Sequence, residues 1–334
     1  MLRMIATEST ADTKVELKDS FNRIHDYLRI ALIDKCNFRC NYCMPVEDMQ
    51  FFHQSKLMTA DEITGIAKLF IQQGVKKIRL TGGEPLVRTD AAVIMEQLAE
   101  TGVELCITTN GVFIDKFIDV FKRSGIRSVN VSLDSLDEKR FKAITHRDYF
   151  QQVFANIQLL IKNGFHVKVN MVVMKNVNDD EVTNFVKRTQ HLPVHIRFIE
   201  FMPFDKNEWN RDKLFTYHEM LQQIESTLDI EKLTDKKHST SKKYRVPGFA
   251  GTFAFITTMS TPFCGDCNRM RLTADGKMKN CLFSKGEADL LTPYRKGDDI
   301  IPIIKKCVGD KKAAMGGQND PEHIVNRSMI QIGG

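Results

Sequence analysis

The sequence predicts an α/β protein built on a parallel sheet. Between about residues 27 and 202, short runs rich in β-branched residues alternate six times with longer segments of helical spacing. Parallel strands need helical crossovers, so this alternation gives a sheet that is either doubly wound or curled into a partial barrel. Chemically unusual residues follow the ends of these runs, and two groups of three cysteines lie near opposite ends of the chain.

The expected elements follow from the local pattern. The six expected strands are, in chain order, Tyr27–Ile33, Lys77–Leu80, Glu104–Thr108, Ser128–Leu133, His166–Val173 and His195–Phe201. The segments between them, such as Ala60–Gln73 and Phe150–Lys162, have the periodicity of amphipathic helices. A capping-box pattern from Thr59 to Glu62 predicts the start of the first helix, and Gly74 follows its last turn.

Three parts are expected along the chain: an N-terminal extension over residues 1–26, the β/α units over 27–233, and a smaller, less regular region over 234–334. The polar stretch Thr234–Lys243 predicts an exposed connector between the last two parts. The chain shows no internal repeat and no low-complexity tract. We therefore expect the C-terminal region to pack on the β/α part.

Composition narrows the class of protein. The 334 residues include 42% hydrophobic residues and carry a net charge of +6, with no Lys/Arg-rich arm for nucleic acid. This charge favours a small phosphorylated ligand at least as much as DNA or RNA. Eight cysteines without a secretory signal predict reduced thiols and a cytoplasmic location. No stretch approaches the length of a membrane span, and no membrane or nucleic-acid partner is expected.

Ligands gather at the carboxyl ends of strands in parallel β/α architectures. Unusual residues follow or end each expected strand: Cys36 after the first, Gly82-Gly83-Glu84-Pro85 after the second, Thr108-Thr109-Asn110-Gly111 at the third, Ser132 and Asp134 at the fourth, Lys168 and Asn170 in the fifth, Glu200 and Met202 at the sixth. We therefore expect them to surround one mouth.

The first cysteine group has the spacing Cys36-x3-Cys40-x2-Cys43. Three thiolates on one short loop can hold three corners of a [4Fe–4S] cube and leave the fourth iron open. A zinc site completed by a distant residue, or a loop of ordinary thiols, is the alternative. An open coordination position favours chemistry over structural support.

With Tyr42 before the third cysteine and Gly82-Gly83-Glu84-Pro85 after the second strand, the chain resembles the radical S-adenosylmethionine (SAM) superfamily. The resemblance implies a partial (β/α)6 TIM-like barrel over residues 27–233, with a smaller cluster-binding region after it. It also implies a [4Fe–4S] cluster on the first three cysteines, whose open iron binds SAM. The SAM contacts it implies are Tyr42, Gly83, Ser132 and Met202. Without the resemblance, Tyr42 could cover the cluster, Ser132 cap a turn and Met202 fill core space.

The second group, Cys264-x2-Cys267-x13-Cys281, lies in a longer motif that begins at Phe263. This motif resembles the GTP 3′,8-cyclase family of molybdenum cofactor biosynthesis, as do Tyr27-Leu-Arg29, Arg197-Phe-Ile-Glu-Phe-Met202 and the terminal Gly333-Gly334. The resemblance implies a second [4Fe–4S] cluster on these three cysteines, whose open iron binds guanine. From the residues alone, a structural zinc site completed by Cys307 or His323 is the alternative.

The resemblance assigns GTP binding to Arg29, Arg79, Thr108, Lys168, Arg269, Met270 and Arg271, and catalytic roles to Arg269, Arg271, Gly333 and Gly334. Arg29 and Arg79 stand in apolar runs, where a buried charge needs an acidic partner or an anionic ligand. From the residues alone, Arg269 and Arg271 could instead lie on a solvated face, and Lys168 could pair with a neighbouring acid. The two glycines could form a frayed chain end or the terminus of an activated carrier protein.

The implied reaction begins when a 5′-deoxyadenosyl radical removes hydrogen from C3′ of GTP. The carbon radical then adds to guanine C8, giving 3′,8-cyclo-7,8-dihydroguanosine 5′-triphosphate. The implied partners are an external electron donor, a possible homodimer and a downstream pterin-forming enzyme, cyclic pyranopterin monophosphate synthase. Asn22-Arg23 departs from the usual Gly-Arg, and Ala31 to Lys35 depart from the usual approach to the first cysteine.

Two other functions are compatible with parts of this pattern. A peptide-modifying radical SAM enzyme with auxiliary clusters would share the first cysteine group but would not need paired arginines or a Gly-Gly end. A metal-stabilised RNA-binding module would account for the positive charge. It would require aromatic residues interleaved with basic ones, which a single Trp and scattered Tyr do not supply.

Overall fold

The alternating pattern forms six β/α units whose strands pair in chain order. The computed structural model describes residues 15–44, 49–235, 237–318 and 320–333. The paired strands are β1 (Tyr27–Ala31), β2 (Lys77–Thr81), β3 (Glu104–Thr109), β4 (Ser128–Ser132), β5 (His166–Val173) and β6 (His195–Glu200). All five pairings between them are parallel.

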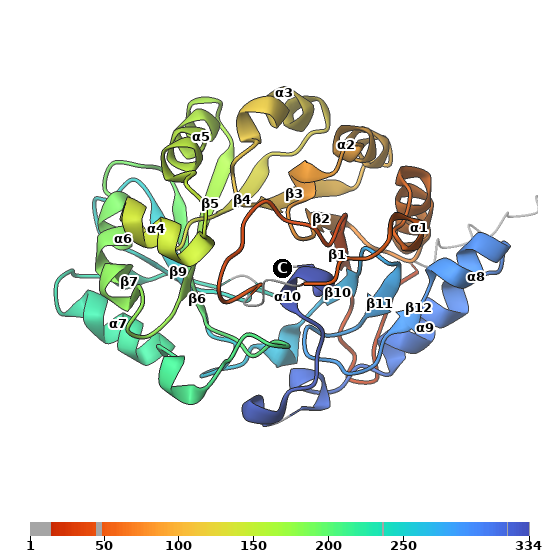
Figure 1. Cartoon of the computed structure of the whole chain (residues 1–334). Coiled ribbons are helices and arrows are strands. Elements are labelled where there is room, and N and C mark those ends of the chain that lie inside the picture. Colours follow the sequence, from red (N-terminus) through yellow and green to blue (C-terminus); the bar gives the residue numbers. More distant parts are fainter. Residues whose placement is uncertain (1–14, 45–48, 236, 319, 334) are drawn as a thin grey trace, which may run out of the picture.

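Helices lie on the outer side of the curved sheet (Figure 1). They are α1 (Ala60–Gln72), α2 (Ala91–Ala99), α3 (Ile114–Arg123), α4 (Glu138–Thr145), α5 (Phe150–Lys162), α6 (Val182–Arg188) and α7 (Tyr217–Glu225). The expected capping box of α1 is present: Thr59 Oγ1 accepts from the Glu62 amide at 3.2 Å, and Glu62 Oε2 accepts from the Thr59 amide at 2.7 Å. The predicted α/β fold, a partial barrel rather than a doubly wound sheet, is confirmed.

The C-terminal region extends both edges of the same sheet. It contributes β8 (Lys242–Arg245), β9 (Thr252–Ile256), β10 (Arg269–Leu272), β11 (Lys277–Lys279) and β12 (Ala288–Asp289), followed by α8 (Leu291–Lys296), α9 (Ile301–Gly309) and α10 (Met329–Ile332). Strand β7 (Glu231–Lys232), at the end of the β/α part, pairs with β8. Strand β10 pairs in parallel with β1, and β9 pairs in parallel with β6. The region is therefore joined to the barrel by strand pairing as well as by packing.

The stretch Thr234–Lys243 was expected to be an exposed connector, and this is wrong for its second half. Strand β8 begins at Lys242 and pairs with β7 and β9, while Ser241 is buried. Residues 237–241 line a cavity inside the barrel. Polar composition alone misled the prediction, because a polar segment can also face a polar cavity.

The strands separate an apolar outer face from a polar interior. In β1, Leu28 and Ile30 are fully buried in the core beneath the helices, whereas Tyr27 and Arg29 line the internal cavity. Successive side chains of a strand point to opposite faces, so one strand serves both environments. Cys106 is fully buried, which suits its small apolar side chain. Among the described residues, no helix is long and apolar enough to cross a membrane.

Glu200 at the end of β6 is a structural residue rather than part of the mouth. Its buried carboxylate accepts hydrogen bonds from the backbone amides of Tyr217 (2.9 Å), Met259 (2.7 Å) and Ser260 (3.0 Å), and from the Ser260 hydroxyl. It therefore joins β6 to α7 and to the loop after β9. Its side chain does not line the main cavity, contrary to the expectation from its strand-end position.

Replacing Glu200 by alanine should leave these buried donors without an acceptor. Each unsatisfied buried group costs about 1–3 kcal/mol, so we expect the free energy of unfolding to fall by about 3 kcal/mol or more. Urea denaturation of the anaerobically prepared protein measures this change. The exposed Glu225→Ala is the control, and equal midpoints for the two variants would show that the Glu200 network does not stabilise the fold.

Candidate active site

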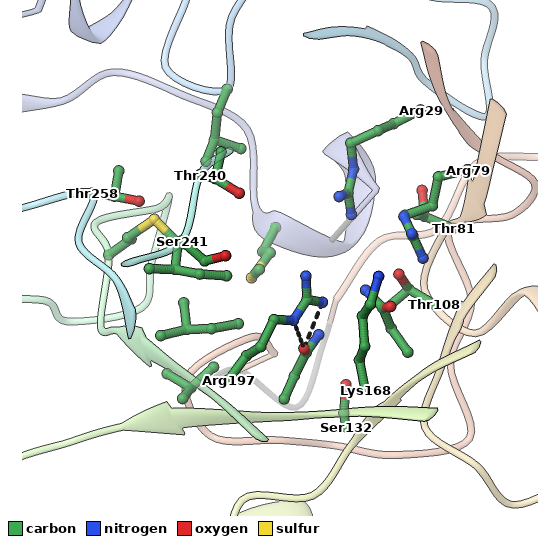
Figure 2. A pocket seen from close by; sticks show the side chains of 18 of the residues that line it. Arg29, Arg79, Thr81, Thr108, Ser132, Lys168, Arg197, Thr240, Ser241 and Thr258 are labelled. Carbon is green, nitrogen blue, oxygen red and sulfur yellow. Dashed lines mark hydrogen bonds between the residues drawn. The ribbon is translucent and has the colours of Figure 1, made fainter. Parts of the chain in front are cut away.

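A cavity of about 730 Å³ occupies the interior of the barrel, and all six cysteines of the two groups line it. Its walls come from β1 to β6, β9 and β10, together with the cysteine loops. Figure 2 shows Arg29, Arg79, Lys168 and Arg197 pointing into this space from different strands. The structure thus brings together residues that lie more than 200 positions apart.

The first cysteine loop follows β1 and is fastened to the end of α4. The amides of Arg39 and Asn41 donate to the carbonyls of Thr145 (2.9 Å) and Ile144 (3.1 Å). Burial, reinforced by nearby negative groups, raises the pKa of Cys36 and that of Cys43 to about 12. Thiolates buried together in this way need cations beside them, which the irons of a cluster would provide, so this donor set fits the group.

The Gly82–Pro85 motif connects the first cysteine loop to the end of β3. The Gly83 and Glu84 amides donate to the carbonyls of Ile33 (2.7 Å) and Lys35 (2.9 Å). Glu84 is buried and accepts from Thr109 Oγ1 (2.8 Å) and from the Asn110 amide (2.6 Å). Burial raises the pKa of Glu84 to about 7. A Cβ on Gly83 would lie 2.3 Å from the Lys35 carbonyl oxygen, so only glycine fits this close approach.

The four residues assigned to SAM, Tyr42, Gly83, Ser132 and Met202, all line the cavity. Tyr42 donates its hydroxyl proton to Asp134 Oδ2 at 2.8 Å. Asp134 Oδ1 in turn accepts from the Val172 amide at 2.9 Å, which fixes the carboxylate between β4 and β5. These contacts tie the first cysteine loop, which carries Tyr42, to the end of β4 and to β5.

The second cysteine group faces the cavity from the C-terminal region. The Cys267 amide donates to the Cys264 carbonyl at 3.3 Å. Burial raises the pKa of Cys281, and the nearby Cys267 and Cys264 add to this rise. In the described part of the chain, no three His, Cys, Asp or Glu side chains are arranged around a single metal ion. Exposed His323 pairs with Asp320, and Cys307 does not line the cavity. Neither residue is therefore placed to complete the alternative zinc site.

The cations assigned to GTP form one wall with Arg197. We call this set the cationic wall: Arg29, Arg79, Lys168, Arg197, Arg269 and Arg271. Arg79 donates to the Tyr27 hydroxyl (2.5 Å) and the Ile107 carbonyl (2.9 Å). Arg197 donates twice to Asn170 Oδ1, at 2.9 and 2.7 Å, as Figure 2 shows. These partners are neutral, so they orient the guanidinium groups without cancelling their charge.

The charges of Lys168 and Arg197 in this wall remain available to a ligand. Burial and the neighbouring Arg197, Arg79 and Lys77 lower the pKa of Lys168 to about 8, and burial lowers the pKa of Arg197 to about 9. Within the described residues, Lys168 and Arg197 form no ion pair with a carboxylate. The acidic neighbour considered for Lys168 is thus absent there. Arg269 and Arg271 line the cavity rather than an outer solvated face.

One residue assigned to GTP, Met270, differs in position from the rest. The Met270 side chain is fully buried in the hydrophobic core and does not line the cavity, because it points to the opposite face of β10 from Arg269 and Arg271. Any contact of Met270 with a nucleotide is therefore limited to its main chain.

The C-terminal tail enters the ring of strands through α10 (Figure 1). The Gly333 carbonyl accepts a hydrogen bond from Arg271 Nη1, and a Cβ on Gly333 would lie 2.8 Å from Thr81 Oγ1. Gly333 has φ of 82°, which also favours glycine. Gly334 lies outside the described residues.

Several cavity residues were missed by the sequence interpretation. Arg197, Lys77 and Thr81 line the cavity, and so do His238 and Ser241 from the segment before β8. Arg197 and Lys77 carry the signal that identified Arg29 and Arg79, a charge at an alternate position of an apolar strand. Lys77 differs in being paired with Glu104 at 2.5 Å. The segment before β8 gave no comparable signal.

The barrel, the three-cysteine loop and the glycine motif together define a radical SAM protein. A family profile described as the radical SAM superfamily matches residues 30–189, and one described as Molybdenum Cofactor Synthesis C matches residues 194–316. Membership of the superfamily implies a [4Fe–4S] cluster and SAM. Streptococcus suis SuiB, solved bound to SAM, has a similar fold with a TM-score of 0.60, 14% identity and coverage of 82% of this chain and 67% of its own.

Similarity to individual proteins identifies the family within this superfamily. The GTP 3′,8-cyclase of Thermodesulfovibrio yellowstonii is 40% identical over 95% of this chain and 100% of its own length. The mitochondrial GTP 3′,8-cyclase of Arabidopsis thaliana is 43% identical over 95% of this chain and 83% of its own. Human molybdenum cofactor biosynthesis protein 1 is 42% identical over 99% of this chain, which spans about half the length of such animal relatives. The chain belongs to the GTP 3′,8-cyclase family of radical SAM proteins.

Gly83→Ala should displace the first cysteine loop, because its new Cβ would overlap the Lys35 carbonyl oxygen. Overpacking of this kind costs about 1–3 kcal/mol, and here the strain falls directly before Cys36. We expect lower iron content and a lower melting temperature after anaerobic purification. Gly286→Ala is the matched control, since its Cβ would meet open space. Full iron loading of the Gly83 variant would show that the loop tolerates the shift.

Proposed function

We propose that the protein is a GTP 3′,8-cyclase that acts in molybdenum cofactor biosynthesis. The observation that carries this proposal is the placement of two three-cysteine groups on one cavity whose wall is cationic. One group would serve radical formation and the other would fix the purine, while the wall binds the triphosphate. The full-length similarity to proteins named GTP 3′,8-cyclase supports the same activity.

Cys36, Cys40 and Cys43 would hold the first [4Fe–4S] cluster. When bound, this cluster supplies the electron that cleaves SAM to methionine and a 5′-deoxyadenosyl radical. Tyr42, Gly83, Ser132 and Met202 are placed to orient SAM along the cavity. Their role is to keep the reactive carbon close to its target and away from water and other hydrogen donors.

Cys264, Cys267 and Cys281 would hold a second [4Fe–4S] cluster, which when bound supplies an open iron for the guanine. The cationic wall would take the triphosphate, because arginine and lysine donors suit phosphate oxygens. Thr108 Oγ1 and Asn130 Oδ1 are buried in the cavity lining without a hydrogen-bond partner in the described structure, so a polar ligand would satisfy them. Met270 could add its main chain.

The proposed reaction moves hydrogen from ribose C3′ of GTP to the deoxyadenosyl carbon and forms a C3′–C8 bond. An external electron and a proton complete 3′,8-cyclo-7,8-dihydroguanosine 5′-triphosphate. Arg269, Arg271 and the tail at Gly333 would organise this end of the cavity, and Gly334 is proposed to share their catalytic role. A homodimer, the external electron donor, transfer of product to a pterin-forming enzyme and a cytoplasmic location stay predictions.

Substrate choice tests the proposal directly. Anaerobic incubation with SAM, a reductant and each ribonucleoside triphosphate should yield 5′-deoxyadenosine and a cyclised nucleotide with GTP, as followed by chromatography and mass spectrometry. A peptide-modifying enzyme would show no preference for GTP. Absence of GTP-dependent 5′-deoxyadenosine from protein with a loaded first cluster would overturn the assignment.

The Cys281→Ser variant tests the role of the second cysteine group without changing the first. We expect iron per chain to fall from about eight to about four or fewer if the serine releases the second cluster, while SAM binding persists. GTP turnover should fall at least about 100-fold, because the base is no longer held. Iron analysis, SAM binding and product formation are measured on the same preparation. Undiminished turnover would count against the second group as the guanine site.

Binding of the triphosphate should depend on the charge of Lys168. In the free protein the pKa of Lys168 is about 8, and a bound anion raises this pKa. Below pH 8 the amine is therefore already charged when GTP binds. Above pH 8 it is mostly neutral and must take up a proton on binding. GTP affinity should therefore be constant below about pH 8 and fall by up to about tenfold per pH unit above it. Calorimetric titration between pH 7 and 9.5 measures this.

Lys168→Met should weaken GTP binding and remove this component of the pH dependence. The pKa of Tyr27 is also about 8, since the nearby Arg79 and Arg29 outweigh the opposing effect of burial, so its ionisation would act in the same direction. Tyr27→Phe separates the two groups. If the slope above pH 8 survives in Lys168→Met and disappears in Tyr27→Phe, the lysine is not responsible.

A further inference from the structure

Lys311 is a buried cation next to the second cysteine group, and neither the sequence interpretation nor the reaction makes use of it. It follows α9 and is only 3% exposed, whereas its neighbour Lys312 is exposed. Lysine is rarely buried unless its charge has a specific partner. The partner of Lys311 therefore indicates what the residue does.

The Lys311 ammonium group donates to Cys267 Sγ at 3.4 Å and to the Arg269 carbonyl at 3.0 Å. In the described part of the chain these are its hydrogen-bond partners, and neither is a carboxylate. A hydrogen bond from an ammonium group to sulfur is favourable when the sulfur carries negative charge. The contact thus fits a thiolate ligand better than a neutral thiol.

The segment that carries Lys311 is held against the second cysteine loop by Arg23. Arg23 donates to the Cys264 carbonyl and the Ala313 carbonyl, both at 2.8 Å, and to the Lys312 carbonyl at 2.8 Å. Asp19 accepts from Arg23 Nε at 2.6 Å and fixes the guanidinium group. One side chain therefore binds both the cysteine loop and residues 312–313, which restricts the distance between Lys311 and Cys267.

We propose that Lys311 is a positioning residue that tunes the second cluster through its charged hydrogen bond to the Cys267 ligand. The inference rests on the proposed function, which places a cluster on these cysteines. A cation beside a ligand sulfur withdraws electron density from the cluster and favours its reduced state, so the reduction potential rises. The open iron is then a better acceptor for a donor atom of the purine.

In the described residues no charged side chain donates a hydrogen bond to a sulfur of the first cysteine group; the Arg39 guanidinium acts there only through space and through its bond to the Cys36 carbonyl. Cys36 Sγ accepts from the Phe38 amide at 3.3 Å and lies 3.8 Å from Asn110 Nδ2, and both of these donors are neutral. No lysine in the described residues donates to Cys36, Cys40 or Cys43. We therefore expect the two clusters to differ in potential, with the second the more easily reduced.

Lys311→Met tests this proposal, with Lys312→Met as the matched control at the exposed neighbour. The reduction potential of each cluster is measured by redox titration with electron paramagnetic resonance, and iron is measured per chain. We expect the second cluster of Lys311→Met to have a more negative potential, or to be lost while the first remains. The first cluster, and both clusters of Lys312→Met, should match the wild type. The KM for GTP should rise by about tenfold in Lys311→Met alone.

Lys311→Gln keeps a hydrogen-bond donor without the charge. It tests the same effect on the reduction potential if the Lys311→Met variant does not fold. Its second cluster should have a potential below that of the wild type. A second cluster that keeps the wild-type potential in a folded Lys311 variant would overturn the role of Lys311. A wild-type protein with only about four irons per chain would instead overturn the second cluster, and with it the proposed function, so the two failures are distinguishable.

Discussion

Buried positive charge inside the barrel is the constraint on which the rest of this structure depends. Arg79, Lys168 and Arg197 project from three strands into one cavity, and neutral groups orient the two arginines. Burial, and then repulsion between neighbouring charges of one sign, depresses the pKa of Lys168 and that of Arg197. Such an arrangement lowers the stability of the protein unless an anion binds. The interior therefore favours binding of an anionic ligand such as a triphosphate.

The strands accommodate this charge because their two faces serve different environments. Outward residues such as Leu28 and Ile30 build the core under the helices, while inward residues such as Arg29 line the cavity. The apolar core stabilises the barrel independently of what lies inside it. The interior can therefore carry groups chosen for binding, and the loops at the strand ends can carry the cysteines.

Two small networks hold the two cysteine groups in the lining of that interior. Glu84 joins the glycine motif to the end of β3 beside the first group. Arg23, from the segment before β1, joins the second group to residues 312–313. In each network the ionisable side chain makes directional hydrogen bonds to backbone groups and to one neighbouring side chain, which fixes its position. The distance between the two groups is thus set by the sheet to which both networks are attached.

The sequence by itself determined the β/α alternation, the capping box at Thr59 and the six cysteines, because each is a local pattern with its own physical cause. The positions of Gly83, Ser132 and Met202 at or after strand ends also predicted that these residues lie around one mouth of the barrel. Arg197 could have been found in the same way as Arg29, since both stand at alternate positions of apolar strands. Only the tertiary structure decided that β9 and β10 continue the sheet, that Met270 lies in the core, and that Glu200 and Lys311 have partners far along the chain. Those outcomes depend on pairing and burial between distant segments, and a local pattern contains no information about which segments meet.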